Sequence, residues 1–228
     1  WHEDVLGLLV ATPSNPTGTV LDAATLKALS TTVRERNGLL IVDEIYQGLE
    51  YGAPPHTALA SCAPDGLFVV NSFSKYFGMT GWRLGWLVAP REYVRELEKL
   101  AQHFFISPST PAQHAALAAF SPATLEILEQ RRAEFSARRN ALLPALRDIG
   151  FSINAEPEGA FYLYAEIASL AEDSNTLARQ LIEQAFVATT PGLDFGHHNA
   201  SRHLRFAYTT RTPRLLEAVE RIQKVLSA

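Results

Sequence analysis

The sequence predicts an α/β protein in which a parallel sheet with flanking helices precedes a smaller α+β domain. Four short runs are apolar at odd and even positions alike, as in strands covered on two faces: 6–11, 38–42, 67–70 and 84–89. A helical pattern joins the first two runs, which indicates a parallel crossover unit. The pattern changes again after Gly150. We therefore expect a large domain over residues 1–120, a long interdomain helix over 121–150 and a small C-terminal domain over 151–228.

The helix between the first two strands has recognisable start and stop signals. Asp22 is a suitable N-cap, and Asn37-Gly38 is a suitable stop. Leu26, Leu29 and Val33 recur at helical spacing between them. One face of this helix should therefore pack against the sheet.

The remaining elements follow from periodicity. Three more helices are expected over about 91–104, 111–120 and 121–149, the last opened by a proline suited to a first turn. The charged stretch "RRAEFSARR" (131–139) is expected to be a solvated face of that helix. In the small domain we expect strands at 159–167 and 203–210, a helix at 174–187 and a closing helix over "TPRLLEAVERIQKVL".

Composition limits the class of protein. The chain has 228 residues, 47% of them hydrophobic and 19% charged, which is typical of a soluble globular protein. A net charge of -4 argues against nucleic acid or an anionic membrane as a partner. The single cysteine, Cys62, cannot form an internal disulfide, and no apolar stretch approaches the ~18 residues of a membrane span. We expect a cytoplasmic protein.

Polar side chains follow each of the first three apolar runs. These side chains are an amide (Asn15), a carboxylate (Asp43), a phenol (Tyr46), two hydroxyls (Ser72 and Ser74) and an amine (Lys75). The carboxyl ends of parallel strands meet at one edge of a sheet, where ligands of open α/β folds bind. Neither a metal-ligand spacing nor a glycine-lysine-serine phosphate loop is present in the sequence.

These residue types suit an aldehyde that carries a phosphate. A lysine at the end of a buried strand can act as an amine nucleophile toward a carbonyl. Two hydroxyls beside it, together with Arg83, suit a phosphate group. Pyridoxal 5'-phosphate combines both groups, and a carboxylate such as Asp43 would keep its ring nitrogen protonated. Taken singly, each residue also has a structural explanation as a turn, a cap, a core aromatic or half of an ion pair.

Six stretches resemble the pyridoxal-phosphate-dependent aminotransferases of fold type I, class I and II, in the family's order. They are "SNPTG" (14–18), "VDEIYQ" (42–47), "SFSKYFGMTGWRLG" (72–85), "PEGAFYLY" (157–164), "PGLDFG" (191–196) and "HLRFAYT" (203–209). The resemblance implies the C-terminal part of the family's large domain, a mostly parallel sheet flanked by helices, followed by the small α+β domain. It also implies an aminotransferase that uses an L-amino acid and a 2-oxo acid.

The resemblance assigns a role to each matching position. It implies that Lys75 forms the internal aldimine with pyridoxal phosphate and then moves the substrate proton. The pyridinium would pair with Asp43, and the ring's phenolic oxygen would accept from Tyr46 and Asn15. The phosphate would be held by Ser72, Ser74 and Arg83. The substrate carboxylate would be clamped by Arg205, with Asn15 assisting.

Family members carry an N-terminal segment before the "NPTG" motif, whereas this sequence begins at Trp1. We therefore expect a fragment of a homodimeric enzyme. A carbon-sulfur β-lyase and an aminotransferase-like sensor domain of a transcriptional regulator share the motifs and remain alternatives. The sequence does not specify the amino donor or acceptor.

Overall fold

The computed structural model describes residues 1–52 and 54–227. The chain divides into two compact units. Unit 1 comprises Trp1–Pro13 and Val20–Arg132, and unit 2 comprises Ser14–Thr19 and the chain from Ala133 onward. Most contacts of each unit therefore lie within that unit.

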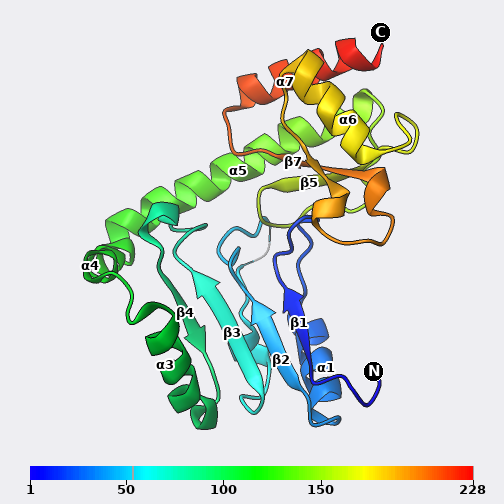
Figure 1. The fold of residues 1–228 in the computed structure, drawn as a ribbon. Coiled ribbons are helices and arrows are strands. Elements are labelled where there is room, and N and C mark those ends of the chain that lie inside the picture. Colours follow the sequence, from blue (N-terminus) through cyan, green and yellow to red (C-terminus); the bar gives the residue numbers. More distant parts are fainter. Residues whose placement is uncertain (53, 228) are drawn as a thin grey trace. The chain divides into compact units, whose positions relative to one another are not determined.

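Unit 1 is built on a four-stranded sheet with the strand order β1-β2-β3-β4 (Figure 1). The first three strands are parallel, and the fourth is antiparallel to β3: β1 (Gly7–Ala11), β2 (Leu39–Asp43), β3 (Leu67–Ser72) and β4 (Gly85–Val88). Helix α1 (Ala23–Arg34) connects β1 to β2. The α/β class and the parallel crossover predicted from the sequence are confirmed.

One face of the sheet packs on α1. Leu26 and Val33 of the helix are almost fully buried in one cluster with alternate residues of β2 and β3, among them Val42 and Val69. The short helix α2 (Ala58–Ser61) adds Ala58 to this cluster. The predicted N-cap is also present, because the Asp22 carboxylate accepts a hydrogen bond from the Thr25 amide at 2.7 Å. The apolar spacing and the capping residue together explain why this segment is a helix.

Strand β4 differs from the prediction of two covered faces. All four of its residues are exposed. It is the last strand in the sheet order, and it borders an apolar groove of about 1140 Å³ shared with helix α3 (Arg91–Phe105). An edge strand beside an open groove has no packed layer on that side, so the prediction was wrong for 84–89. It was also wrong for 6–11, because β1 lies at the other end of the sheet order and Leu6 and Leu9 are 83% and 67% exposed.

Two further helices follow α3, and the second of them runs from unit 1 into unit 2, because the division falls at Ala133. They are α4 (Thr110–Ala119) and α5 (Pro122–Asp148), and α5 begins at the predicted proline. Across the part of the chain that the structure describes, no helix is both long and apolar enough to cross a membrane.

The charged stretch 131–139 of α5 is not simply a solvated face. Arg138 is only 9% exposed, and its guanidinium donates to the Thr209 carbonyl at 2.8 Å and pairs with Glu134. Arg132 donates to the Glu50 carbonyl at 3.1 Å. The prediction was wrong at these positions, because a long arginine side chain can bury its stem when its charged end reaches an acceptor.

Unit 2 contains a three-stranded antiparallel sheet with the order β5-β7-β6. Its strands are β5 (Tyr162–Glu166), β6 (Thr190–Pro191) and β7 (His203–Ala207). The helices are α6 (Ser174–Gln180), which a π-helical turn (Leu181–Ala185) continues, and α7 (Thr212–Leu226). Leu163, Leu177, Leu204 and Ile222 are at most 1% exposed, so both the strands and the helices contribute buried side chains to unit 2. The predicted strands and helices of 159–226 are confirmed.

The segment Ser14–Thr19 belongs to unit 2 although it lies near the start of the chain. The Gly18 carbonyl accepts hydrogen bonds from the amides of Glu158 and Gly159, both at 2.9 Å. Gly18 has φ +69°, and a Cβ there would lie 2.4 Å from the Cβ of Pro157. Only glycine satisfies both the backbone conformation and this close approach.

Candidate active site

The ends of the three parallel strands in unit 1 lie side by side. Asp43, the last residue of β2, pairs in register with Ala11 of β1 and with Val70 of β3. Its carbonyl accepts a hydrogen bond from the Thr12 amide at 3.0 Å. The polar residues that follow these strands therefore start from one edge of the sheet, as the parallel arrangement predicts.

Lys75 lies in the turn that follows β3, and it is half-buried. Its Nζ is 5.5 Å from the centroid of the Tyr46 ring, within the range of a cation–π contact. Tyr46 is 4% exposed. The structure thus brings together two of the predicted site residues, which come from the segments after β2 and β3.

The turn that carries Lys75 is held by several backbone contacts. The Phe73 amide donates to the Leu84 carbonyl at 3.0 Å, and the Gly78 amide donates to the Lys75 carbonyl at 3.0 Å. The Thr80 hydroxyl donates to the Ser74 carbonyl at 2.7 Å. These contacts fix the backbone on both sides of the amine.

The two predicted phosphate hydroxyls are adjacent. Ser72 Oγ lies 2.9 Å from Ser74 Oγ and also accepts a hydrogen bond from the Ser74 amide at 3.1 Å. Ser74 is 8% exposed, so its hydroxyl lies in a largely dry position. A pair of close hydroxyls of this kind suits the oxygens of a phosphate group.

Arg83 and Asp43 make other contacts. Arg83 is exposed, has a left-handed backbone with φ +51°, and donates from one guanidinium nitrogen to the Thr80 carbonyl at 2.8 Å. The Asp43 carboxylate accepts a hydrogen bond from the Ile45 amide at 3.0 Å. The phosphate role of Arg83 and the pyridinium role of Asp43 stay predictions, as do the roles of the other predicted site residues.

Arg205, on β7 of unit 2, contacts Asn15, and both residues were predicted to bind the substrate carboxylate. One terminal nitrogen of its guanidinium donates to Asn15 Oδ1 at 2.7 Å, and the other donates to the Thr190 hydroxyl at 3.3 Å. The segment 14–19 belongs to the same unit, which explains how residues 190 positions apart meet. Asn15 itself is exposed.

The guanidinium of Arg205 lies between two aromatic rings. Its central carbon is 4.2 Å from the ring centroid of Tyr162 and 4.6 Å from that of Phe195. Its Nε is buried and has no hydrogen-bond partner among the described residues. Such a flat, held guanidinium suits a carboxylate, which accepts two parallel hydrogen bonds from one arginine.

Sequence reasoning did not identify Tyr162, Phe195 or Thr190 as parts of this site. The alternation of "YLY" (162–164) places both tyrosines on one face of β5, which is a signal that could have marked Tyr162. Phe195 lies in an irregular segment, where no periodicity applies. Its contact with Arg205 is visible only in the fold.

The donor set of unit 1 fits pyridoxal phosphate. It offers a primary amine for the aldehyde, two adjacent hydroxyls for the phosphate and a carboxylate at a strand end for the ring nitrogen. Among residues 1–52 and 54–227, no group of three or more histidine, cysteine, aspartate or glutamate side chains could hold a metal ion.

Comparisons with known proteins identify the family of the chain. The family model described as "Aminotransferase class I and II" matches residues 2–222. A valine-pyruvate aminotransferase from Mycobacterium tuberculosis is 38% identical over 95% of this chain and 56% of its own length. An aspartate aminotransferase from Geobacillus stearothermophilus is 35% identical over 97% of this chain and 57% of its own.

Solved structures show the same similarity. The crystal structure of an aminotransferase from Mycobacterium tuberculosis has a TM-score of 0.92 and 37% identity, over 97% of this chain and 57% of that one. That of a putative aminotransferase from Silicibacter pomeroyi has a TM-score of 0.89 and 42% identity, over 97% and 59%. The chain therefore spans somewhat more than half the length of these proteins.

Proposed function

Because the chain belongs to the class I and II aminotransferases, we propose that it transfers an amino group between an L-amino acid and a 2-oxo acid, with pyridoxal 5'-phosphate bound at Lys75. The family is generally dependent on this cofactor. The proposal rests mainly on the position of the Lys75 amine. It lies in the turn after β3, whose backbone is held by hydrogen bonds, and it is 5.5 Å from the centroid of the Tyr46 ring.

Each candidate site residue of unit 1 then has a role in this reaction. When bound, the cofactor supplies an aldehyde that condenses with an amine, releasing water, and a ring that takes up the electrons of the substrate Cα–H bond. Lys75 would hold the aldehyde carbon through Nζ, and once the substrate amine has displaced it, the same nitrogen would move a proton from the substrate Cα to that carbon. The carboxylate of Asp43 keeps the ring nitrogen protonated, and the hydroxyl of Tyr46 donates to the ring's phenolic oxygen.

The phosphate and the substrate carboxylate need separate binding groups. Ser72, Ser74 and Arg83 donate hydrogen bonds to the phosphate. In unit 2, Arg205 binds the α-carboxylate, which every amino acid and 2-oxo acid substrate shares. Asn15 supports this contact, because it already holds one end of the guanidinium, and it also donates to the ring's phenolic oxygen.

The protein is further proposed to be a homodimer, since aminotransferases are commonly dimeric. Light scattering on the protein at its full natural length tests this point, and a monomer at micromolar concentration would contradict it. The β-lyase and sensor-domain alternatives are not favoured, because the relatives and solved structures described above are named aminotransferases.

The proposal is tested by reducing the cofactor-loaded protein with borohydride and mapping its peptides. We expect a single pyridoxyl label, on Lys75, and none after Lys75→Arg. Lys27→Arg is the matched control, because Lys27 lies on the exposed side of α1. A label on other lysines, or none at all, would show that the site is wrong.

A further inference from the structure

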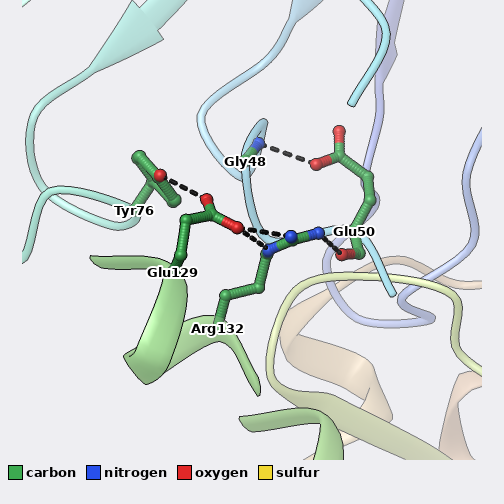
Figure 2. Close-up of polar contacts among 5 residues, drawn as sticks. All are labelled: Gly48, Glu50, Tyr76, Glu129 and Arg132. Atoms are coloured by element: carbon green, nitrogen blue, oxygen red, sulfur yellow. Dashed lines mark hydrogen bonds and ion pairs between the residues drawn. The ribbon is translucent and has the colours of Figure 1, made fainter. Parts of the chain in front are cut away.

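A polar cluster connects the turn that carries Lys75 to helix α5, and Figure 2 shows it. We name it the Tyr76 cluster: Gly48, Glu50, Tyr76, Glu129 and Arg132. The Tyr76 hydroxyl donates to Glu129 Oε1 at 2.6 Å. Arg132 donates from Nε to the other oxygen of Glu129 at 2.9 Å and from a terminal nitrogen to the Glu50 carbonyl at 3.1 Å. Two residues of α5 therefore bind both the segment after β2 and the turn after β3.

The ring of Tyr76 also makes close contact with Gly48. A Cβ at Gly48 would lie 2.7 Å from two carbons of that ring, and the backbone there has φ +88°. The Glu50 carboxylate accepts a hydrogen bond from the Gly48 amide at 2.7 Å, which closes the turn around this contact. The spacing between the two segments is thus set by the Tyr76 ring on one side and by a glycine on the other.

Both segments carry residues of the candidate site. Tyr76 directly follows Lys75, and Gly48 lies two residues after Tyr46. The Leu49 amide donates to the Tyr46 carbonyl at 3.0 Å, and the Gly78 amide donates to the Lys75 carbonyl at 3.0 Å. A displacement of the Tyr76 ring would therefore move the backbone on which the amine and the phenol depend.

From these contacts we propose that Tyr76, held by Glu129 and Gly48, is a positioning residue that sets where the Lys75 amine lies against the Tyr46 ring. The inference rests on the proposed function, since it concerns the same amine. A lysine side chain has four rotatable bonds, so its end is placed accurately only when the backbone below it is fixed. The Tyr76 cluster supplies that fixation from α5.

The hydrogen bond that holds Tyr76 persists at neutral pH. Burial raises the pKa of Tyr76 to about 12, and the bond to Glu129 and its negative charge act in the same direction. The phenol therefore stays protonated and continues to donate. Arg132 in turn pairs with Glu129 and orients it toward the phenol.

The test compares Tyr76→Phe and Glu129→Gln with the wild type, at full natural length. Tyr76→Phe keeps the ring against Gly48 and removes only the hydroxyl. Tyr76 packs edge-on against Phe77. Tyr93→Phe is the matched control, because Tyr93 packs edge-on against Phe68 while its hydroxyl bonds to no described residue. Melting temperatures are recorded for each variant, and Glu129→Gln provides the same readouts should Tyr76→Phe not fold.

Two readouts are needed. The first is amide hydrogen exchange without cofactor. We expect the exchange rates of the Gly78 and Leu49 amides to rise about three- to tenfold in both variants. This rise is smaller than the one expected from loss of a fully buried hydrogen bond to a charged group. The second is the pH midpoint of the absorbance change of pyridoxal phosphate bound at Lys75, which we expect to shift by about half a pH unit or more. The double variant should shift no further than either single variant.

The outcomes separate the two proposals. If the wild type takes no pyridoxyl label at Lys75, the proposed function fails, and this inference fails with it. If the label is present but the absorbance midpoint is the same in all variants, only the positioning role is overturned. That conclusion holds even if hydrogen exchange rises, because a purely structural contact would loosen the turn without changing the environment of the amine.

Discussion

The substitution Glu50→Gln should change the pH dependence of folding. Glu50 is 4% exposed, and one carboxylate oxygen accepts from the Gly48 amide at 2.7 Å. Burial raises its pKa from the ordinary 4.5 to about 7, and the nearby charge of Glu44 adds to this effect. The Gly48 amide and the guanidinium of Arg132 act in the opposite direction. The folded protein therefore holds this proton more tightly than the unfolded chain does.

The sign and size of the effect follow from this difference. Between 4.5 and about 7 the unfolded chain has lost the proton and the folded protein has not, so the free energy of unfolding falls as pH rises through this window. At about 1.4 kcal/mol for each pH unit, the total loss is about 3 kcal/mol. Glutamine has no proton to lose, and its side-chain oxygen can still accept from Gly48. Relative to the wild type, the variant should therefore gain up to about 3 kcal/mol between about pH 5 and about pH 8.

Urea unfolding at these two pH values measures the gain, with two spectroscopic probes that must coincide. Glu35→Gln is the control for the substitution itself, because Glu35 lies on the exposed surface of the same unit. A stability difference between Glu50→Gln and the wild type that is the same at both pH values would refute the reasoning. It would mean that burial does not hold the proton on Glu50.

Two further predictions concern unit 2. Arg205→Ala should weaken the binding of all α-amino acids alike by roughly 1.5–3 kcal/mol, the scale of a charged hydrogen bond. Substitution of the exposed Arg202 by alanine should leave this binding unchanged. Calorimetry with several amino acids measures the effect, and a loss of affinity confined to amino acids with one kind of side chain would place Arg205 in a specificity pocket. Gly18→Ala should lower the melting temperature more than Gly52→Ala, because both glycines have positive φ but only Gly18 has Pro157 in the way of a Cβ. Equal effects of the two alanines would mean that the clash is relieved without cost.

Much of unit 1 could be predicted from the sequence because its signals are local. The apolar runs, the Asp22 cap and the proline at 122 each depend on a few neighbouring residues, and the structure has the corresponding strands and helix starts. The exposure of β4 could not be predicted in this way. It depends on what lies across the sheet edge, and the sequence of the strand itself carries no information about that.

Some features of the candidate site could likewise be predicted from the sequence, and others could not. The strand ends that carry Asp43 and Lys75 follow from topology, and topology follows from periodicity. The aromatic pair around Arg205 does not, because Phe195 reaches the guanidinium from an irregular segment. The Tyr76 cluster was missed for a similar reason. Glu129 and Arg132 resemble ordinary surface charges until the fold brings them to Tyr76 and to Glu50.

The early segment Ser14–Thr19 has a practical consequence for anyone who wishes to study unit 2 alone. A gene fragment that starts at Ala133 would omit this segment. The amides of Glu158 and Gly159 would then lose their acceptor, and Arg205 would lose Asn15. To keep these contacts, a truncated protein would need residues 14–19 joined to it by a designed linker. A single truncation point therefore does not separate the two units.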